Sequence, residues 1–164
     1  MKKEKFNIIN LVNNDGCFDL QFRKDTRHER TNSPTYYRWK AQFIITTPKN
    51  QVKVLEKVKK IIGCGAVSVA ANQARFSVQK IDDVVDCIIP FFTKNKLTDK
   101  KKKDFELWRK AVLIIFDNKG IYLSQWKKND LMHLMEIHKA MARHKQKPRS
   151  GKWMEMAKTL AKTT

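Results

Sequence analysis

The sequence has 164 residues, of which 35 are lysine or arginine and 16 are aspartate or glutamate, so its formal net charge at pH 7 is +19. A chain of this length can bury one hydrophobic core without disulfides, and so large a positive surplus favours a polyanionic partner, with nucleic acid first. No apolar run approaches the length of a membrane-spanning helix, so an acidic membrane surface is a minor alternative.

The cysteines and the ratio of lysine to arginine indicate the kind of cellular compartment in which the protein resides. Cys17, Cys64 and Cys87 are odd in number and far apart, which predicts neither a disulfide framework nor a zinc site, and favours a reducing compartment. The basic and then apolar start contains Glu4 and has no small-residue cleavage site, so we expect no secretory signal. Lysines outnumber arginines 27 to 8, as an AT-rich coding sequence tends to produce, and this favours an organelle, either mitochondrion or chloroplast.

The first two elements are a helix and a strand. Residues 4–14 place apolar side chains at helical spacing and predict a short helix. We expect it to end at Asp15-Gly16, where the glycine can take the left-handed conformation that stops a helix. From Cys17 the pattern alternates, which predicts a half-buried strand with the apolar face Phe18, Leu20 and Phe22.

A hairpin and a covering helix follow. Residues 24–34 are polar and contain an Asn-Ser-Pro turn signal, which predicts a hairpin loop. Residues 36–46 alternate again and predict a second strand, which Thr47-Pro48 should break. The core-facing residues of this strand are Trp39, Ala41, Phe43 and Ile45. Residues 49–62 predict a helix closed by Gly63 and Gly65.

The second half repeats the pattern and then becomes helical. Residues 66–69 and 74–80 predict another hairpin, with Ala74, Phe76 and Val78 inward. A helix should begin at Asp82-Asp83 and end near Phe91-Phe92, and Thr98 should cap the next one. Beyond Gly120 two amphipathic stretches, 124–141 and 150–162, predict further helices. We therefore expect a domain over residues 1–118 and a basic helical C-terminal extension over residues 119–164.

The outward positions of the predicted sheet are basic or carry amides. The ordinary alternative is a solvated sheet face, but the net charge favours binding to nucleic acid. The candidate nucleic-acid-binding residues of the sheet and its first loop are Arg23, Lys24, Arg27, Arg30, Arg38, Lys40, Gln42, Arg75 and Gln79.

Two further segments are strongly basic. Cations near a helix N-terminus are repelled by the positive end of the helix dipole, and a bound phosphate would offset this repulsion. For residues 100–103 we therefore prefer phosphate contact over an ordinary solvated turn. Residues 139–152 contain no acid and are either a flexible tether or an arm that orders on a phosphate backbone. The candidate residues are Lys100, Lys101, Lys102, Lys103, Arg143, Lys145, Lys147 and Arg149.

Aromatic and histidine residues favour structural roles. Trp108, Trp126 and Trp153 fall at helical spacing among apolar neighbours, which favours core anchors over base-stacking platforms. His133 and His138 are five residues apart and miss a common helix face, so they do not predict a metal pair.

The order of elements over residues 6–116 resembles the LAGLIDADG family of homing endonucleases and intron maturases. The phrases that carry the resemblance are NDGCF, FIITTPKNQVKVLEKVKKIIGCGAV, CIIPFF and LTDKKKKDFELW. The resemblance implies an α+β fold, an αββαββα saddle with an antiparallel sheet, here followed by C-terminal helices. It also implies that the motif helix packs against a second copy, and since this chain has one motif, a homodimer.

The family motif aligns on residues 8–16. The resemblance implies that Asp15 stands where the family keeps its metal-binding carboxylate, and that Lys101 fits the lysine of the catalytic pocket. In a cleaving enzyme, Asp15 would bind magnesium and Lys101 would stabilise charge. The alternative for Asp15 is an ordinary helix-end residue that makes backbone hydrogen bonds.

Several positions depart from the family pattern. Ile9 and Asn10 replace the small pair at which two motif helices cross, and Asn13 replaces the usual first acid. Thr47 stands where the family has a glutamine at the end of the second strand, and Gln51 replaces a basic residue. These departures disfavour both the homodimer and cleavage.

Two hypotheses follow. We expect a non-catalytic nucleic-acid-binding protein, derived from a homing endonuclease, that needs no cofactor and binds structured organellar RNA, either ribosomal RNA within a ribosomal particle or a group I intron. The alternative is an active homodimeric endonuclease that cuts a long double-stranded DNA site with magnesium.

Overall fold

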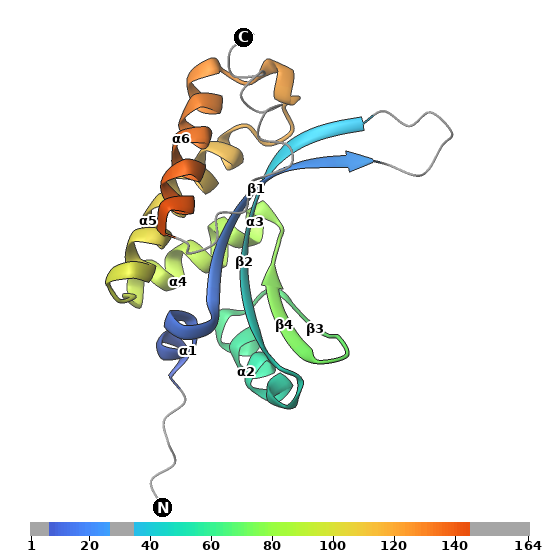
Figure 1. Ribbon diagram of the computed structural model, residues 1–164, viewed down its shortest axis with the longest axis vertical. Helices are drawn as coiled ribbons and strands as arrows, with labels where there is room; N and C mark the ends of the chain where they lie inside the picture. The colour runs from blue at the N-terminus through green and yellow to red at the C-terminus, as the bar shows by residue number, and fades with distance from the viewer. Residues whose placement is uncertain (1–6, 27–34, 145–164) are drawn as a thin grey trace, which may run out of the picture. The chain divides into compact units, whose positions relative to one another are not determined.

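The computed structural model describes residues 7–26 and 35–144 (Figure 1). The strands are β1 (Gly16–Thr26), β2 (Thr35–Pro48), β3 (Ala66–Val69) and β4 (Gln73–Val78). The α-helices are α1 (Ile8–Asp15), α2 (Val52–Ile62), α3 (Ile81–Asp83), α4 (Ile89–Lys94), α5 (Asp99–Asp117) and α6 (Lys128–His144). Shorter turns of helix are η1 (Lys49–Gln51), η2 (Val84–Ile88) and η3 (Leu123–Gln125).

The four strands form one sheet in the order β1-β2-β4-β3. Strand β4 pairs antiparallel with both of its neighbours, β2 and β3. Helix α1 precedes the first hairpin and α2 lies between the two hairpins, so the predicted α+β class and the αββαββ order are confirmed.

The described residues fall into two compact units. The first contains those of positions 1–19 and 42–105, and the second contains those of positions 20–41 and 106–164. The domain boundary expected at residue 118 stays a prediction.

The core of the first unit is built on aromatic rings. Phe18 lies against Phe43 with ring centroids 5.2 Å apart, and both contact Phe92 edge-on. Phe76 meets Phe43 in the same edge-to-face geometry, which is the arrangement that the ring quadrupoles favour. The alternation read from the sequence therefore placed the apolar faces of β1, β2 and β4 correctly.

Helix α2 packs on the β3–β4 hairpin (Figure 1). It buries Leu55, Val58 and Ile62, which recur at helical spacing, and ends at Gly63 with φ +90°. Gly65 also has a positive φ, and a Cβ there would meet the Phe76 ring at 2.7 Å. The Gly63-Cys64-Gly65 turn thus brings the chain tightly onto β4.

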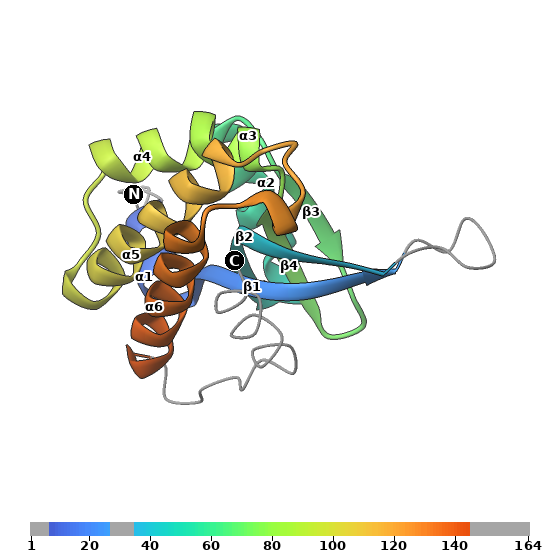
Figure 2. The ribbon, with the colours of Figure 1, turned by 90° about the horizontal axis from the view of Figure 1, so that it is seen from above.

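The second unit is centred on two helices. The second half of α5 and α6 run side by side in both views (Figure 1 and Figure 2). Their buried residues are Trp108, Ala111, Val112, Ile115, Leu131, Leu134, Ile137 and Met141. Phe22 contacts Trp39 and stacks on Tyr37, and Trp39 meets the His138 ring at 6.0 Å. Trp108 and Trp126 are both buried, so the prediction that they are core residues is confirmed.

Three sequence expectations are corrected. Gly16 is extended, with φ −79°, and not left-handed. A glycine is needed there for space, because a Cβ would lie 2.6 Å from the Val12 carbonyl oxygen. Strand β2 is not broken at Thr47-Pro48 but runs through Pro48, which pairs with Gln73 at the strand end, where a missing N–H is tolerated.

The third correction concerns the helix expected to end near Phe91-Phe92. The helical run begins at Ile81 and continues past Pro90 to Lys94. Directly before the proline lies the π-helical turn η2, in which the Ile89 N–H bonds to the Val84 carbonyl. Proline clashes with the carbonyl four residues earlier, and the wider turn makes room for its ring.

Some predictions cannot be compared with the structure. The helix expected over residues 150–162 and Trp153 lie outside the described residues. Within the described part of the chain, the structure contains no helix with the length and apolar character needed to cross a membrane.

Candidate nucleic-acid interface

The junction of α1 and β1 presents the candidate catalytic carboxylate. Asn7 caps α1, because its side-chain oxygen accepts hydrogen bonds from the N–H groups of Ile9 and Asn10. Asp15 is the last residue of the helix and its side chain is exposed. The carboxylate is therefore available to an external partner.

Helix α5 is tied to this junction by two hydrogen bonds. Lys101 donates from its Nζ atom to the Gly16 carbonyl, and the Thr98 N–H donates to the Asn13 side-chain oxygen at 3.4 Å. The structure thus brings Lys101, which lies 86 residues after Asp15 in the chain, to the residue next to Asp15. Both side chains have a structural use as well: Lys101 and Asn13 position the start of α5 against the motif helix.

The residue at the family's glutamine position does not face the polar side of the sheet. Thr47 pairs with the buried Ala74, is 3% exposed, and donates from Oγ1 to the Pro48 carbonyl at 3.2 Å. Its neighbour Thr46 pairs with Arg75 and lies on the opposite, polar face. Thr47 therefore cannot reach a ligand bound on that face.

Arg75 marks the polar face of the first unit. It is exposed in the middle of β4, flanked in register by Thr46 on β2 and Ser68 on β3. The next row on the same face contains Ser77, paired with Ile44 and Ala66. Arg75 is thus an exposed cation whose neighbours in register, Thr46 and Ser68, have short polar side chains.

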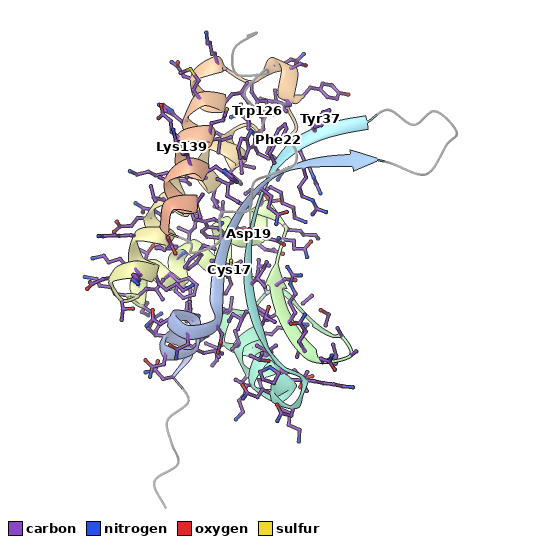
Figure 3. All side chains as sticks on the ribbon, viewed as in Figure 1. Cys17, Asp19, Phe22, Tyr37, Trp126 and Lys139 are labelled. Atoms are coloured by element: carbon purple, nitrogen blue, oxygen red, sulfur yellow. The ribbon has the colours of Figure 1, made fainter. Side chains whose placement is uncertain are left out.

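Gln42 is not on an exposed face, and that expectation is wrong. The side chain is 5% exposed, and its Nε2 donates to an Asp19 carboxylate oxygen at 2.8 Å. Asp19, labelled in Figure 3, was also predicted from the alternation to be outward. Its exposed fraction is 6%. The pair satisfies its own hydrogen-bonding groups across β1 and β2, as burial of polar groups requires.

The other candidates in the first unit are exposed. Gln79 is exposed and its amide donates to the Ser77 hydroxyl at 3.4 Å. In the lysine run, Lys100, Lys102 and Lys103 are exposed, whereas Lys101 is half-buried at the Gly16 carbonyl. Three cations at the start of α5 therefore project toward solvent.

The remaining strand candidates belong to the second unit. Arg38 is exposed, and Arg23 and Lys40 are half-buried. Lys24 lies in β1 and Arg143 in α6. The candidates outside the described residues are Arg27, Arg30, Lys145, Lys147 and Arg149.

The structure also brings together two cysteines that the sequence did not connect. Cys64 follows α2 and Cys87 lies in η2, and their thiols are close enough to hydrogen-bond. Burial raises the pKa of the Cys64 thiol to about 12, with the neighbouring Cys87 as the next cause. No local spacing predicts this pair, because it depends on how two helices pack.

A magnesium ion would find a limited donor set in one chain. Among the described residues, no group of three or more histidine, cysteine, aspartate or glutamate side chains is arranged to hold a metal. Magnesium prefers six oxygen ligands, of which Asp15 offers one carboxylate, and the neighbouring Gly16 carbonyl already accepts from the Lys101 ammonium. The residues fit such an ion only if a second chain or the nucleic acid supplies further oxygens.

A motif helix that ends in an exposed carboxylate and leads directly into an antiparallel sheet of two hairpins defines the LAGLIDADG homing-endonuclease class of fold. A sequence model described as "LAGLIDADG endonuclease" matches residues 11–112, which is more than half of the chain. The protein belongs to the LAGLIDADG endonuclease family.

Two curated fungal proteins are similar to it. "Probable intron-encoded DNA endonuclease 1" of Mycosarcoma maydis is 29% identical over 101 residues, which are 61% of this chain and 34% of that protein. "Probable intron-encoded endonuclease 3" of Neurospora crassa is 28% identical over 105 residues, which are 63% of this chain and 19% of that protein. The matched region thus spans about a third or less of the length of these relatives.

Solved structures show the same fold. The homing endonuclease I-TnaI superposes with a TM-score of 0.66 at 20% identity, covering 94% of this chain and 93% of that one. I-CpaMI bound to uncleaved DNA gives a TM-score of 0.71 at 17% identity, over 96% of this chain and 50% of that one. I-LtrWI bound to target DNA gives 0.65 at 26% identity, over 82% and 43%.

Proposed function

We propose that this protein binds nucleic acid through its exposed cations and does not cleave it. The observation that carries the proposal is the inward orientation of Thr47, which removes the family's polar group from the strand end next to the expected reaction site. Asn13 in place of the first acid supports the same conclusion, and its side-chain oxygen is already used to accept a hydrogen bond from the Thr98 N–H. Asp15 remains as one exposed carboxylate, without the first acid of the motif and without a side chain at position 47 on the polar face of the sheet.

Binding is supported by charge and by exposure. The net charge of +19 disfavours the compact state through self-repulsion, which a polyanionic partner would offset, and exposed cations lie on β4 and at the start of α5. Each phosphate neutralised by such a cation releases a condensed counterion, so affinity should fall steeply with salt. Relatives in this family are seen bound to DNA targets, which supports a nucleic acid as the partner class.

We further propose structured RNA in an organelle as the partner, either an intron or a ribosomal RNA. The curated relatives are named as intron-encoded, and a protein that has lost cleavage can remain useful by holding the RNA. A folded RNA is recognised mainly by its shape and by contacts to its phosphates, and less by readout of its bases. An exposed cation flanked by short polar side chains, such as Arg75 between Thr46 and Ser68, is suited to a phosphate contact. Homodimer formation is not required for this function.

An active magnesium-dependent endonuclease is the second candidate. It is favoured by the exposure of Asp15 and by the Lys101 hydrogen bond to Gly16, which place a carboxylate and an ammonium group at adjacent residues. In that case a second copy would supply the other carboxylate, and the ions would stabilise the attacking and leaving oxygens of the phosphodiester.

The two candidates are separated by Asp15→Asn. The charge-matched control is Glu56→Gln, which changes an exposed acid on α2. Each of the three proteins, wild type, Asp15→Asn and Glu56→Gln, is incubated with a pool of randomised duplex DNA and magnesium. The cut ends are then sequenced. We expect no enrichment of cut ends for any of the three, and equal affinity of all three for structured RNA. Cut ends that appear with wild-type protein and Glu56→Gln but vanish with Asp15→Asn contradict the non-cleaving proposal.

A further inference from the structure

The connection between α5 and α6 (Figure 1) is held by side-chain hydrogen bonds. Asn118 is buried, and its side-chain amide donates to the Ile114 carbonyl at 2.9 Å and to an Asp130 oxygen at 3.2 Å. The buried Trp126 donates from its indole N–H to the Ile121 carbonyl at 3.0 Å. Asn118 thus joins the start of the loop to both helices, and the Trp126 bond closes the loop on itself.

The middle of this loop presents an aromatic side chain to solvent. Tyr122 is 69% exposed and the adjacent Ile121 is 44% exposed. The Tyr122 carbonyl accepts from the Gln125 N–H at 2.8 Å, so the backbone that carries the ring is held in the η3 turn. An exposed ring on a fixed backbone loses little conformational entropy when a ligand covers it.

Cations flank the exposed ring in the chain. Lys127 and Lys128 follow Trp126 directly and are exposed, and Lys119 lies over the Phe116 ring at 5.9 Å. The acids near them are Asp117, which is exposed, and Asp130, which accepts from Asn118. The loop and its flanks therefore carry three cations and two acids, and Lys119 and Asp130 already interact with other groups.

We propose that Tyr122 is a stacking platform for an unpaired RNA base, with Lys127 and Lys128 contacting the adjacent phosphates. The inference rests on the proposed nucleic-acid-binding function and adds a contact point outside the sheet. An aromatic face stacks on any base, and a neighbouring cation binds the backbone, which together hold single-stranded segments.

The geometry favours an unpaired base over a continuous duplex. Bases inside a duplex already stack on one another, so an exposed ring gains contact only with a nucleotide that is bulged or looped out. A protein partner would also cover Tyr122 and Ile121, but the exposed lysines that follow a few residues later in the chain favour a polyanion.

The test compares two RNA duplexes, each annealed from two separate strands and therefore without a loop, that differ by one bulged nucleotide. Binding of the fluorescently labelled duplexes to wild-type protein, Tyr122→Phe and Tyr122→Leu is measured by anisotropy. We expect Tyr122→Leu to weaken binding of the bulged duplex about tenfold, while Tyr122→Phe, which keeps the ring, binds like wild type. Binding of the fully paired duplex should be the same for all three proteins.

Each other outcome is informative. If wild-type protein binds neither duplex, the proposed function fails with the inference. If it binds both and Tyr122→Leu changes nothing, the inference alone fails. An unchanged affinity for RNA accompanied by a loss of self-association in Tyr122→Leu would assign the ring to a protein contact and overturn the stacking role. Far-ultraviolet circular dichroism of each variant controls for folding.

Discussion

The buried pair Asp19 and Gln42 shows how a single side chain can be misassigned from an alternating pattern. Both residues occupy outward positions of their strands, yet both are at most 6% exposed and bond to each other. Alternation predicts which side of a strand a residue occupies, but not whether that side is covered. Gln42 is accordingly a structural residue, and its amide is not available for nucleic acid.

Removing this amide should destabilise the fold. We expect Gln42→Ala to lower the free energy of unfolding by about 2 kcal/mol, because a buried carboxylate loses a donor. Urea denaturation followed by tryptophan fluorescence measures the change. Gln79→Ala, at an exposed position of the same face, is the control and should change stability by less than about 0.5 kcal/mol. Equal effects of the two substitutions would contradict the structural role of Gln42.

The two glycines around Cys64 differ in what surrounds them, although both have a positive φ. A Cβ at Gly63 meets nothing within 4 Å, whereas one at Gly65 meets the Phe76 ring and the Ser77 carbonyl below 3 Å. We expect Gly63→Ala to lower the free energy of unfolding by about 1 kcal/mol through backbone strain. Gly65→Ala should lower it clearly more, because the added Cβ also displaces β4 or the Phe76 ring. Thermal denaturation of both variants tests this order, and a reversed order would contradict the packing.

The Cys64 thiol makes stability depend on alkaline pH. Its folded-state pKa of about 12 is raised above the ordinary value of 9.0, mainly by burial. The folded state therefore favours the protonated thiol, and the associated stability is complete below pH 9 and is lost as the pH rises toward 12. We expect wild-type protein to lose more stability between pH 9 and pH 10.5 than Cys64→Ala. Denaturant titrations of both proteins in that range measure the difference, and identical slopes would contradict the prediction.

Helices and strands were predictable where one periodicity governed them. The inward rows of β1, β2 and β4 and the buried face of α2 all followed from spacing, because one side of each element is covered by the same core. The helix that contains Pro90 was expected to end near Phe91-Phe92 and ends at Lys94, and no local pattern predicts the π-helical turn before the proline. Gly16 was also misinterpreted, since the need for a glycine there comes from the crowding of Val12 rather than from a helix-ending conformation.

The candidate site was predictable in part for similar reasons. The resemblance to the family pointed to Asp15 and Lys101, and the structure brings the Lys101 amine to the residue beside Asp15. The sequence reading missed that β2 continues through Thr47, which then joins the inward row of Phe43 and Ile45. It also missed that Gln42 is buried, because that depends on a contact with Asp19 on the neighbouring strand. The Cys64 and Cys87 pair and the exposed Tyr122 likewise arise from packing between elements.

Strand β4 offers the most direct test of the sheet as a binding surface. Arg75 stands among Thr46, Ser68 and Ser77, so a nucleic acid on this face must meet its guanidinium. If the contact is to phosphate, we expect Arg75→Ala to weaken binding and to reduce the salt slope by about one unit, while Arg75→Lys keeps the slope. Affinity measured over a series of salt concentrations provides the slope, and an unchanged slope with Arg75→Ala would remove this face from the interface.

The chain taken as one molecule should bind in a strongly salt-dependent way. With a net charge of +19 and phosphate contacts spread over several elements, affinity should fall by about a thousandfold between 50 and 200 mM salt if six or more phosphates are contacted. A weak dependence would mean that few of the exposed cations meet phosphate. Anisotropy titrations with one labelled RNA at several salt concentrations measure it.

The central claim is that this member of the LAGLIDADG endonuclease family holds nucleic acid, with RNA as its partner, and does not cut it. The most direct measurement is to crosslink the protein in its own cells, purify it under denaturing conditions, digest, and sequence the attached nucleic acid. We predict that intron or ribosomal RNA dominates the recovered sequences. Recovery of one double-stranded DNA locus, with RNA at background, would contradict the claim and favour the endonuclease.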